Sequence, residues 1–364
     1  SMSLDAARYD PIDPLATGPE AVRTAFENQV AYCRDNGAPV TALVCQSLLE
    51  LLDSKRGAGV MDRIRAWAGP PLADALPLRI AGGLHALHLK HEEPGLAAIY
   101  DGLQPVDATA RVADVLERHD RALLPWLNGP PQTNEAGRSW AYAAAMLWLI
   151  EQGCPADFAL YELGSSAGIN LMMDRYRFDL GGVAVGPVDA RMRIVPEWRG
   201  APPPHRPFRV IEAHGCDVAP VDLTDPEQAL RLRAYIWPDL TERFARMDAA
   251  VAEARLAPPR IARMRAGGFV EEVLSEEPRR GVTRAIMHSV VWQYVPTQER
   301  TSITAAIEAA GAAATAEAPL AWVMLEANRD THRHELTVRW WPAGGRAVTL
   351  ATAHPHGAWV EWRD

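Results

Sequence analysis

The sequence predicts an α/β protein in which a helical N-terminal domain precedes a mostly parallel β-sheet. Residues 5–155 carry apolar side chains at helical spacing and show no convincing alternating strand pattern. From residue 156 onward, short apolar runs typical of buried strands alternate with helical patterns. The first of these runs leads into a turn of small residues at 164–168. We therefore expect two domains, one at 5–155 and one at 156–364, in this chain of 364 residues.

The composition is that of an ordinary globular chain, with 48% apolar residues and a net charge of −9. This negative charge argues against nucleic acid as the default partner. No apolar run reaches the length of a membrane span, and no signal-peptide pattern is visible. The four cysteines are scattered, which favours buried, reduced thiols. We expect a cytoplasmic protein that acts on a small molecule, without a membrane partner.

Helical patterns recur throughout the N-terminal domain, at residues 20–35, 40–53, 60–68, 78–90, 109–127 and 137–152. One of them carries His85, His88 and His91. The i, i+3 spacing places two of these side chains on one helix face, but spacing alone is a weak metal signal. We favour histidines at the boundary of an amphipathic helix and predict no metal site.

A polar stretch at 132–138 (QTNEAGR) follows Gly129 and two prolines. It precedes the helix that leads to the first strand, so its polar residues are suited to capping that helix. The alternative interpretation is that Asn134 and Arg138 reach the turn at 164–168 and contact a substrate. Polar loops beside a candidate site often carry function, and both interpretations stay open here.

The segment 157–176 organises the second domain. An apolar run ends at Glu162, the small-residue turn follows, and helical spacing resumes over 168–176. This is the strand–turn–helix unit that directs backbone N–H groups toward an anion or a polar ligand.

The turn resembles the cofactor loop of class I S-adenosylmethionine-dependent methyltransferases, with Ser166 at the position of the middle glycine. In that family, an acidic residue at the strand end orders the loop and faces the cationic end of the cofactor. The resemblance implies a Rossmann-like, methyltransferase-type sheet, S-adenosylmethionine as the cofactor and methyl transfer to a small molecule. The cofactor-binding residues predicted on this basis are Glu162, Gly164, Ser165, Ser166, Gly168 and Asn170.

The same residues also satisfy Gly-x-Ser-x-Gly, the nucleophile elbow of serine hydrolases. Ser166 would then be the nucleophile, with Glu326 or Asp330 as the acid and His354 or His356 as the base. The long helical region before the first strand argues against this interpretation. A third hypothesis is a methyltransferase-like scaffold that binds a ligand without catalysis.

The rest of the second domain contains a long insertion at about 181–260 and further strand patterns at 208–213, 283–290 and 320–326. In Rossmann-type folds an acid after the second strand binds the ribose hydroxyls. The candidates for this role are Asp189, Glu197 and Glu212.

Two residues are predicted to be catalytic. His288 lies at the end of a buried strand, where parallel sheets place ligand contacts, and is our candidate general base, with Tyr294 as the alternative. A hairpin at 335–353 and a last strand at 359–362 follow. His356, in the Gly/Pro loop between them, is a candidate substrate contact, although a simple turn explains it as well.

The whole chain is identified as a member of an uncharacterised bacterial family, a domain of unknown function. The motifs that carry this resemblance are those at 132–138, 162–170, 237–239 and 354–357. The resemblance implies the methyltransferase-like core named above, and it brings no established activity with it.

Overall fold

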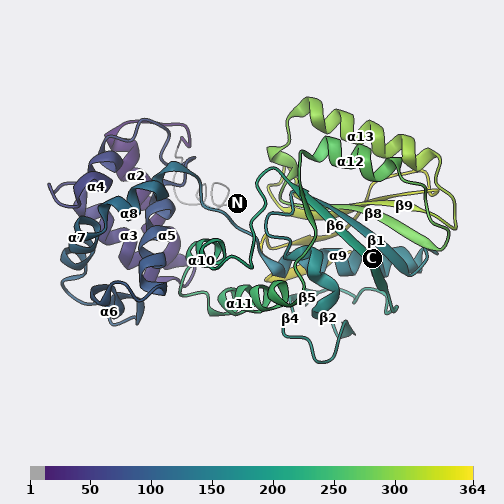
Figure 1. Ribbon diagram of the computed structural model, residues 1–364, viewed down its shortest axis with the longest axis horizontal. Coiled ribbons are helices and arrows are strands. Elements are labelled where there is room, and N and C mark those ends of the chain that lie inside the picture. Colours follow the sequence, from purple (N-terminus) through teal and green to yellow (C-terminus); the bar gives the residue numbers. More distant parts are fainter. Residues whose placement is uncertain (1–12, 364) are drawn as a thin grey trace. The chain divides into compact units, whose positions relative to one another are not determined.

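The structure is a computed structural model that describes residues 13–363. It separates into two compact units (Figure 1). Unit 1 is helical and contains residues 13–133 and 226–245. Unit 2 contains the sheet and comprises residues 134–225 and 246–363.

The boundaries of these units differ from the predicted domains in two places. Residues 134–155 belong to unit 2, because the helix that they form packs on the sheet. Residues 226–245, expected within the insertion of the second domain, belong to unit 1. Residues 5–12 of the predicted N-terminal domain lie outside the described part of the chain.

Unit 1 consists of short helices around one apolar core. They bury one large cluster of apolar side chains, including Phe26, Leu48, Ile64 and Leu116. Each helix contributes the apolar stripe that its sequence period predicts. The elements are α2 (Pro19–Asp35), α3 (Pro39–Leu51), α4 (Ala58–Arg65), α5 (Leu76–Leu89), η1 (Pro94–Leu96), α6 (Ala97–Tyr100), α7 (Ala108–Arg118), α8 (Asp120–Leu123), η2 (Leu124–Asn128) and α10 (Pro226–Ala234).

Asp239 joins the second segment of unit 1 to the first. Its carboxylate accepts hydrogen bonds from the backbone N–H groups of Val40 and Thr41, at 2.9 and 3.2 Å, and from the Thr41 hydroxyl at 2.9 Å. These N–H groups lie in the first turn of α3 and have no partner within the helix. The Trp237-Pro238-Asp239 motif therefore supplies a helix cap from a distant part of the chain.

Unit 2 is built on a nine-stranded sheet in the order β5-β12-β11-β10-β9-β8-β1-β6-β7, formed by described residues. Strands β7, β6, β1, β8 and β9 are parallel, and β10 to β12 follow as an antiparallel meander. The strands are β1 (Asp157–Leu163), β5 (Glu197–Arg199), β6 (Arg209–Asp217), β7 (Ile261–Arg263), β8 (Val282–Ser289), β9 (Leu320–Ala327), β10 (His334–Trp341), β11 (Val348–Ala353) and β12 (Trp359–Trp362). The mixed α/β class and the large, mostly parallel sheet are confirmed.

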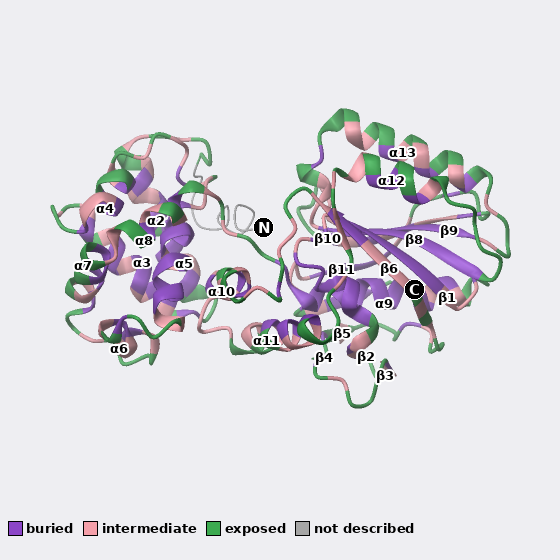
Figure 2. Cartoon of the chain, in the orientation of Figure 1, coloured by how far each residue is buried: buried purple, intermediate pink, exposed green. Residues whose placement is uncertain are grey.

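Helices cover both faces of this sheet. α12 (Ala266–Ser275) and α13 (Thr297–Ala312) lie on one face and α9 (Trp140–Glu151) on the other (Figure 1). α9 is apolar all around and almost completely buried, as Figure 2 shows. The remaining helices are η3 (Ala136–Ser139), η5 (Trp292–Tyr294) and α11 (Thr241–Leu256), which begins in the last residues of unit 1.

The segment after β1 departs from the prediction. Instead of an α-helix over 168–176, the chain forms a short 3₁₀ helix, η4 (Asn170–Arg175). The Tyr176 hydroxyl donates to the Ile169 carbonyl at 2.5 Å, and Tyr176 itself is extended. The chain then enters a small second sheet of β2 (Arg177–Leu180), β3 (Val183–Val185) and β4 (Arg193–Ile194). Strand pairing starts too soon after the turn for a stable α-helix to form.

Candidate functional site

The carboxyl ends of the central parallel strands bring polar side chains to one edge of the sheet. Glu162 is the penultimate residue of β1, Asp217 ends β6 and Ser289 ends β8. The register pairs Glu162 with Gly215 of β6 and with Met287 of β8, so these strands end at nearly the same level. We refer to Glu162, the loop 164–170 and Asp217 as the carboxyl-edge site.

The backbone donors of the loop are already used within the protein. The N–H groups of Ser165 and Gly168 donate to the carbonyls of Cys216 and Ser165, both at 2.8 Å. Two side chains from elsewhere in unit 2 accept the others: Asp217 Oδ2 binds the N–H of Ser166 at 2.8 Å, and Asn134 Oδ1 binds that of Ala167 at 3.1 Å. The expectation that this turn directs its N–H groups toward an anion is therefore wrong for residues 165–168.

The two glycines of the loop are required by its backbone and its packing. Gly164 and Gly168 have φ values of +65° and +76°, a region that residues with a Cβ rarely adopt. A Cβ on Gly164 would lie 2.6 Å from a methyl group of Val291, and one on Gly168 would lie 2.7 Å from Pro259. These glycines permit the tight turn, whether or not a ligand binds beside it.

Glu162 is a buried carboxyl group with only one of its oxygens satisfied. It is 3% exposed, and its Oε2 accepts a hydrogen bond of 2.7 Å from the hydroxyl of Tyr142 on α9. Its Oε1 has no hydrogen-bond partner among the described residues. Burial raises the pKa of Glu162 to about 8, against the opposing effect of the Tyr142 hydrogen bond. The site thus holds a carboxyl group that titrates near neutral pH.

Asn170 adds a second acceptor of the same kind. It is the first residue of η4 and is 2% exposed, and no described residue donates to its Oδ1. Asn170 is one of the predicted cofactor contacts, a role that stays a prediction, and its Oδ1 is an acceptor. Buried acceptors without partners are rare in folded proteins, because leaving one unsatisfied is unfavourable. Glu162 and Asn170 together suit a ligand that donates hydrogen bonds or carries positive charge.

Asp217 is the acid at the end of the second parallel strand, and the sequence analysis did not select it. Its Oδ1 accepts from the Ala219 N–H at 2.9 Å, and its Oδ2 binds the loop. The strand was predicted to end at residue 213, four residues before its observed end at Asp217. The acid at the strand end was therefore sought too early in the chain. Glu212 lies within β6 and forms an ion pair with Arg279 at 2.7 Å. Asp189 and Glu197 precede the strand.

The predicted substrate contacts lie in two segments that meet beside the loop. Asn134 binds the loop as described, and Arg138 Nε donates to the carbonyl of Pro355 at 2.9 Å. A Cβ on Gly137 would lie 2.4 Å from the carbonyl oxygen of His356, so the two backbones are in close contact. The structure thus brings Asn134, Arg138 and His356 into one region. Their role in substrate binding stays a prediction.

His288 is fully buried, and both of its ring nitrogens are engaged. Nδ1 lies 2.7 Å from Glu326 Oε2, and Nε2 accepts a hydrogen bond of 3.0 Å from the Trp322 indole. Glu326 also accepts from the N–H groups of Val291 and Trp292. This network leaves no ring nitrogen for a substrate proton, so we do not retain His288 as the general base. Tyr294 is 75% exposed on η5, and its catalytic role stays a prediction.

A family of proteins described as uncharacterized and conserved in bacteria (DUF2332) matches residues 23–362. This chain belongs to that family. No curated protein and no solved structure gave a significant match. Membership therefore assigns no reaction, and the chemistry of this DUF2332 chain must be argued from its own side chains.

The motifs by which this DUF2332 chain was recognised have two different roles in the structure. Those at 134–138, 162–170 and 354–357 come together around the carboxyl-edge site through the contacts described above. The motif at 237–239 caps α3 within unit 1. The family motifs therefore lie partly at the candidate site and partly at a contact that stabilises the fold.

The serine hydrolase hypothesis finds part of its geometry in the structure. Ser166 has a φ of +53°, consistent with a sharp turn after β1. However, Glu326, one of the two predicted acids, is bound to His288 rather than to a histidine of the 354–357 loop. The Ser166 hypothesis stays a prediction that this geometry does not favour.

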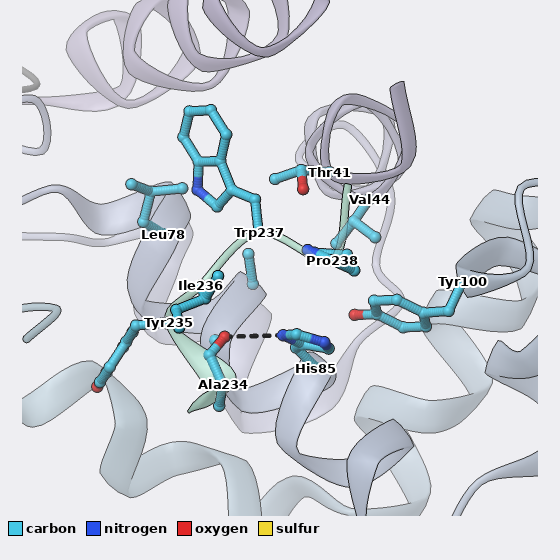
Figure 3. A pocket seen from close by; sticks show the side chains of 12 residues that line it. Thr41, Val44, Leu78, His85, Tyr100, Ala234, Tyr235, Ile236, Trp237 and Pro238 are labelled. Atoms are coloured by element: carbon cyan, nitrogen blue, oxygen red, sulfur yellow. Dashed lines mark hydrogen bonds between the residues drawn. The ribbon is translucent and has the colours of Figure 1, made fainter. Parts of the chain in front are cut away.

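The histidines of α5 serve packing within unit 1, as Figure 3 illustrates for His85. Its Nδ1 lies 2.9 Å from the Ala234 carbonyl oxygen, and its ring stacks on Tyr100 with centroids 5.3 Å apart. Burial lowers the pKa of His85 to about 4. The adjoining cavity has a volume of about 20 Å³, enough for one water molecule.

Residues 13–363 contain neither a metal-binding cluster nor a membrane-spanning helix. No group of three or more histidine, cysteine or acidic side chains is arranged to hold a metal ion. No helix in the same range has the length and the apolar character needed to cross a membrane.

Proposed function

We propose that unit 2 binds S-adenosylmethionine at the carboxyl-edge site and transfers its methyl group to a small molecule. The observation that carries the proposal is the pair of buried acceptors, Glu162 Oε1 and Asn170 Oδ1, which lack partners among the described residues. They flank a turn whose backbone N–H groups are already satisfied. A site of this kind favours a ligand with cationic and hydroxyl groups over a phosphate.

The order of the strands supports the same proposal. Numbered along the chain, the five parallel strands β7, β6, β1, β8 and β9 have the spatial order 3-2-1-4-5. That order is typical of doubly wound, Rossmann-type sheets, in which ligands bind at the carboxyl edge where the order reverses. The reversal here falls between β1 and β8, and Glu162 lies at the end of β1.

The residues present fit this cofactor by their chemistry. Glu162 and Asn170 would accept from its ammonium or hydroxyl groups, and Asp217 is the acid at the second strand end, where related sheets bind ribose. The bound cofactor supplies an electrophilic methyl group on a positively charged sulfur. The protein's contribution is to hold the acceptor nucleophile in line with that methyl group and to exclude water.

The test is binding to the intact chain. Thermal unfolding and titration calorimetry with S-adenosylmethionine and S-adenosylhomocysteine should both detect a ligand. At about a hundred times the dissociation constant, binding adds roughly 2.7 kcal/mol of stability. ATP and NAD serve as comparison ligands, because they present phosphates to the same edge.

Variants must separate the ligand site from the fold. Gly164 is unsuited to this, because any Cβ there collides with Val291. Asn170→Leu removes the acceptor while keeping the branched side-chain skeleton of four heavy atoms, and we expect it to weaken binding at least tenfold. Glu317→Gln changes a carboxylate on an exposed turn and is the control.

The outcomes are distinct. Binding of both adenosyl ligands that is lost in Asn170→Leu supports the cofactor assignment. Binding without methyl transfer to any acceptor would support the non-catalytic scaffold. Failure of both ligands to bind at millimolar concentration would refute the proposal.

A further inference from the structure

A second cavity of ligand size lies in unit 2, away from the carboxyl-edge site. It is a groove of about 440 Å³ lined by the end of η4, by β2, by β3 with the two residues that follow it, and by the segment that enters β6, and we call it the β2–β6 groove. Ligand pockets typically enclose about 300–1,000 Å³. Arg209 at this groove is hydrogen-bonded at 2.7 Å to Asp157, the first residue of β1. Asp157 is separated from Glu162 by roughly 17 Å of extended strand, so the groove is a separate site.

The apolar part of the β2–β6 groove suits a flat ligand. Met173 and Val185 are buried at its base, and Phe208 and Val210 are half-buried along it. No aromatic ring among the described residues packs against Phe208, although aromatic pairs are common elsewhere in unit 2. A half-buried ring without an aromatic neighbour is a suitable surface for a planar ligand to stack on.

The polar part carries a guanidinium group that has no counter-ion. Arg177 Nη1 donates to the carbonyl of Gly186 at 2.6 Å, which holds the side chain against the segment that follows β3. Its Nε is buried and has no acceptor, and no carboxylate of the described residues lies within ion-pair distance of it. Arg209, by contrast, is neutralised by Asp157. Arg177 is therefore the positive charge of the groove that remains uncompensated.

A carboxylate ligand satisfies this arrangement. Charge-assisted hydrogen bonds between a guanidinium and a carboxylate are among the strongest polar contacts in proteins. Asp174 also lines the groove, and its negative charge disfavours a ligand with two charges.

We propose that the β2–β6 groove binds a small organic monocarboxylate with a flat apolar body. The carboxylate pairs with Arg177, and the apolar body lies against Phe208 and the buried base. This proposal is independent of the function proposed for the carboxyl-edge site, because the two sites share no residue.

The experiment uses matched pairs of acid and amide. Benzoate, cinnamate and indole-3-acetate are each titrated into the full chain beside the corresponding neutral amide, by saturation-transfer NMR and calorimetry. We expect at least one acid to bind, and its amide to bind at least tenfold more weakly. Inorganic phosphate, which carries charge without an apolar body, should not compete.

Two variants locate the binding. Arg177→Met keeps the aliphatic stem and removes the guanidinium, and it should abolish the preference for acid over amide. Ala184→Phe fills the groove without changing any charge, and it should remove binding of both members of a pair. Arg193→Met is the control, because Arg193 is the exposed register partner of Arg177 on β4 and does not line the groove.

Each result decides the proposal. Acid binding that is lost in Arg177→Met and Ala184→Phe but kept in Arg193→Met supports it. Should Arg177→Met fail to fold, Ala184→Phe alone still tests the location. The proposal is overturned when none of the three acids binds at millimolar concentration, or when binding persists in both groove variants.

Discussion

The ends of β1 and β8 place two ionisable side chains at the same edge of one sheet, and their surroundings differ. His288 on β8 has both ring nitrogens engaged by Glu326 and Trp322. Glu162 on β1 is bound through Oε2 only, and its other oxygen has no partner among the described residues. Both side chains are buried, so exposure does not distinguish them.

This difference shows that the hydrogen bonds a side chain already makes are a better guide to a functional site than its residue type. Histidine is the commonest general base, and His288 was the first candidate from the sequence because it ends a buried parallel strand. A buried histidine whose two ring nitrogens are both hydrogen-bonded contributes to the packing of the fold. A buried carboxyl group with one free oxygen is the less stable arrangement, and such groups concentrate at functional sites.

The largest expected effect is a pH dependence of stability that comes from Glu162. Its folded pKa, about 8, lies above the ordinary value of 4.5, so the folded protein binds this proton more tightly than the unfolded chain. The resulting stability is fully present below pH 4.5 and is lost as the pH rises to about 8. Denaturant unfolding at pH 5 and pH 9 should show a loss of roughly 4 kcal/mol from this group.

Glu162→Gln isolates that contribution, since the amide retains an acceptor for Tyr142 and does not titrate. The variant should lose less stability than the wild type between pH 5 and pH 9. If the stability of the two proteins depends equally on pH, the pKa of Glu162 is not raised in the folded protein. The contrast drawn between Glu162 and His288 would then be wrong.

A smaller effect is expected when the β8 network is broken. Glu326→Ala removes the acceptor of His288 Nδ1 and of two backbone N–H groups. We expect a loss of about 3 kcal/mol in unfolding free energy, because these donors become unsatisfied. The dissociation constant of any ligand at the carboxyl-edge site should change less than threefold. A large change in ligand affinity with little loss of stability would reverse the roles that we assign to the two strand ends.

The smallest expected effect comes from the hydrogen bond between Tyr142 and Glu162. Tyr142→Phe removes the hydrogen bond to Glu162 Oε2 and should cost about 1 kcal/mol. Because this bond lowers the pKa of Glu162, the variant should titrate at higher pH than the wild type. Chemical shifts of a ¹³C-labelled carboxyl group report that pKa directly, and a pKa that falls instead would exclude Tyr142 as a donor to the charged form.

Much of the fold was readable from local sequence. The helical patterns predicted for the N-terminal domain correspond to α2 to α5 and α7 to α9, and the apolar runs correspond to β1, β6, β8 and β9. Periodicity succeeds in these places because each element buries one face or both. It failed at 168–176, where the expected helix became η4, since early strand pairing competed with helix formation.

The candidate site was readable only in part. The turn at 164–168 stood out through its glycines, and both glycines adopt the positive φ that such a turn needs. Asp217 and Tyr142 carried no local signal, since one lay beyond the predicted end of a strand and the other in an apolar helix. Both became relevant through contacts with residues 51 and 20 positions away.

The sequence by itself determined the family, the division into helical and α/β parts, and the glycine turn after the first strand. These features depend on side-chain period and on backbone freedom, which are local properties. Only the tertiary structure decided which polar groups are satisfied: that Asp217 and Asn134 occupy the donors of the loop, that His288 is fully paired, and that Glu162 and Asn170 each keep one free oxygen. Hydrogen-bond satisfaction depends on atoms brought together from distant positions, and no local pattern records it.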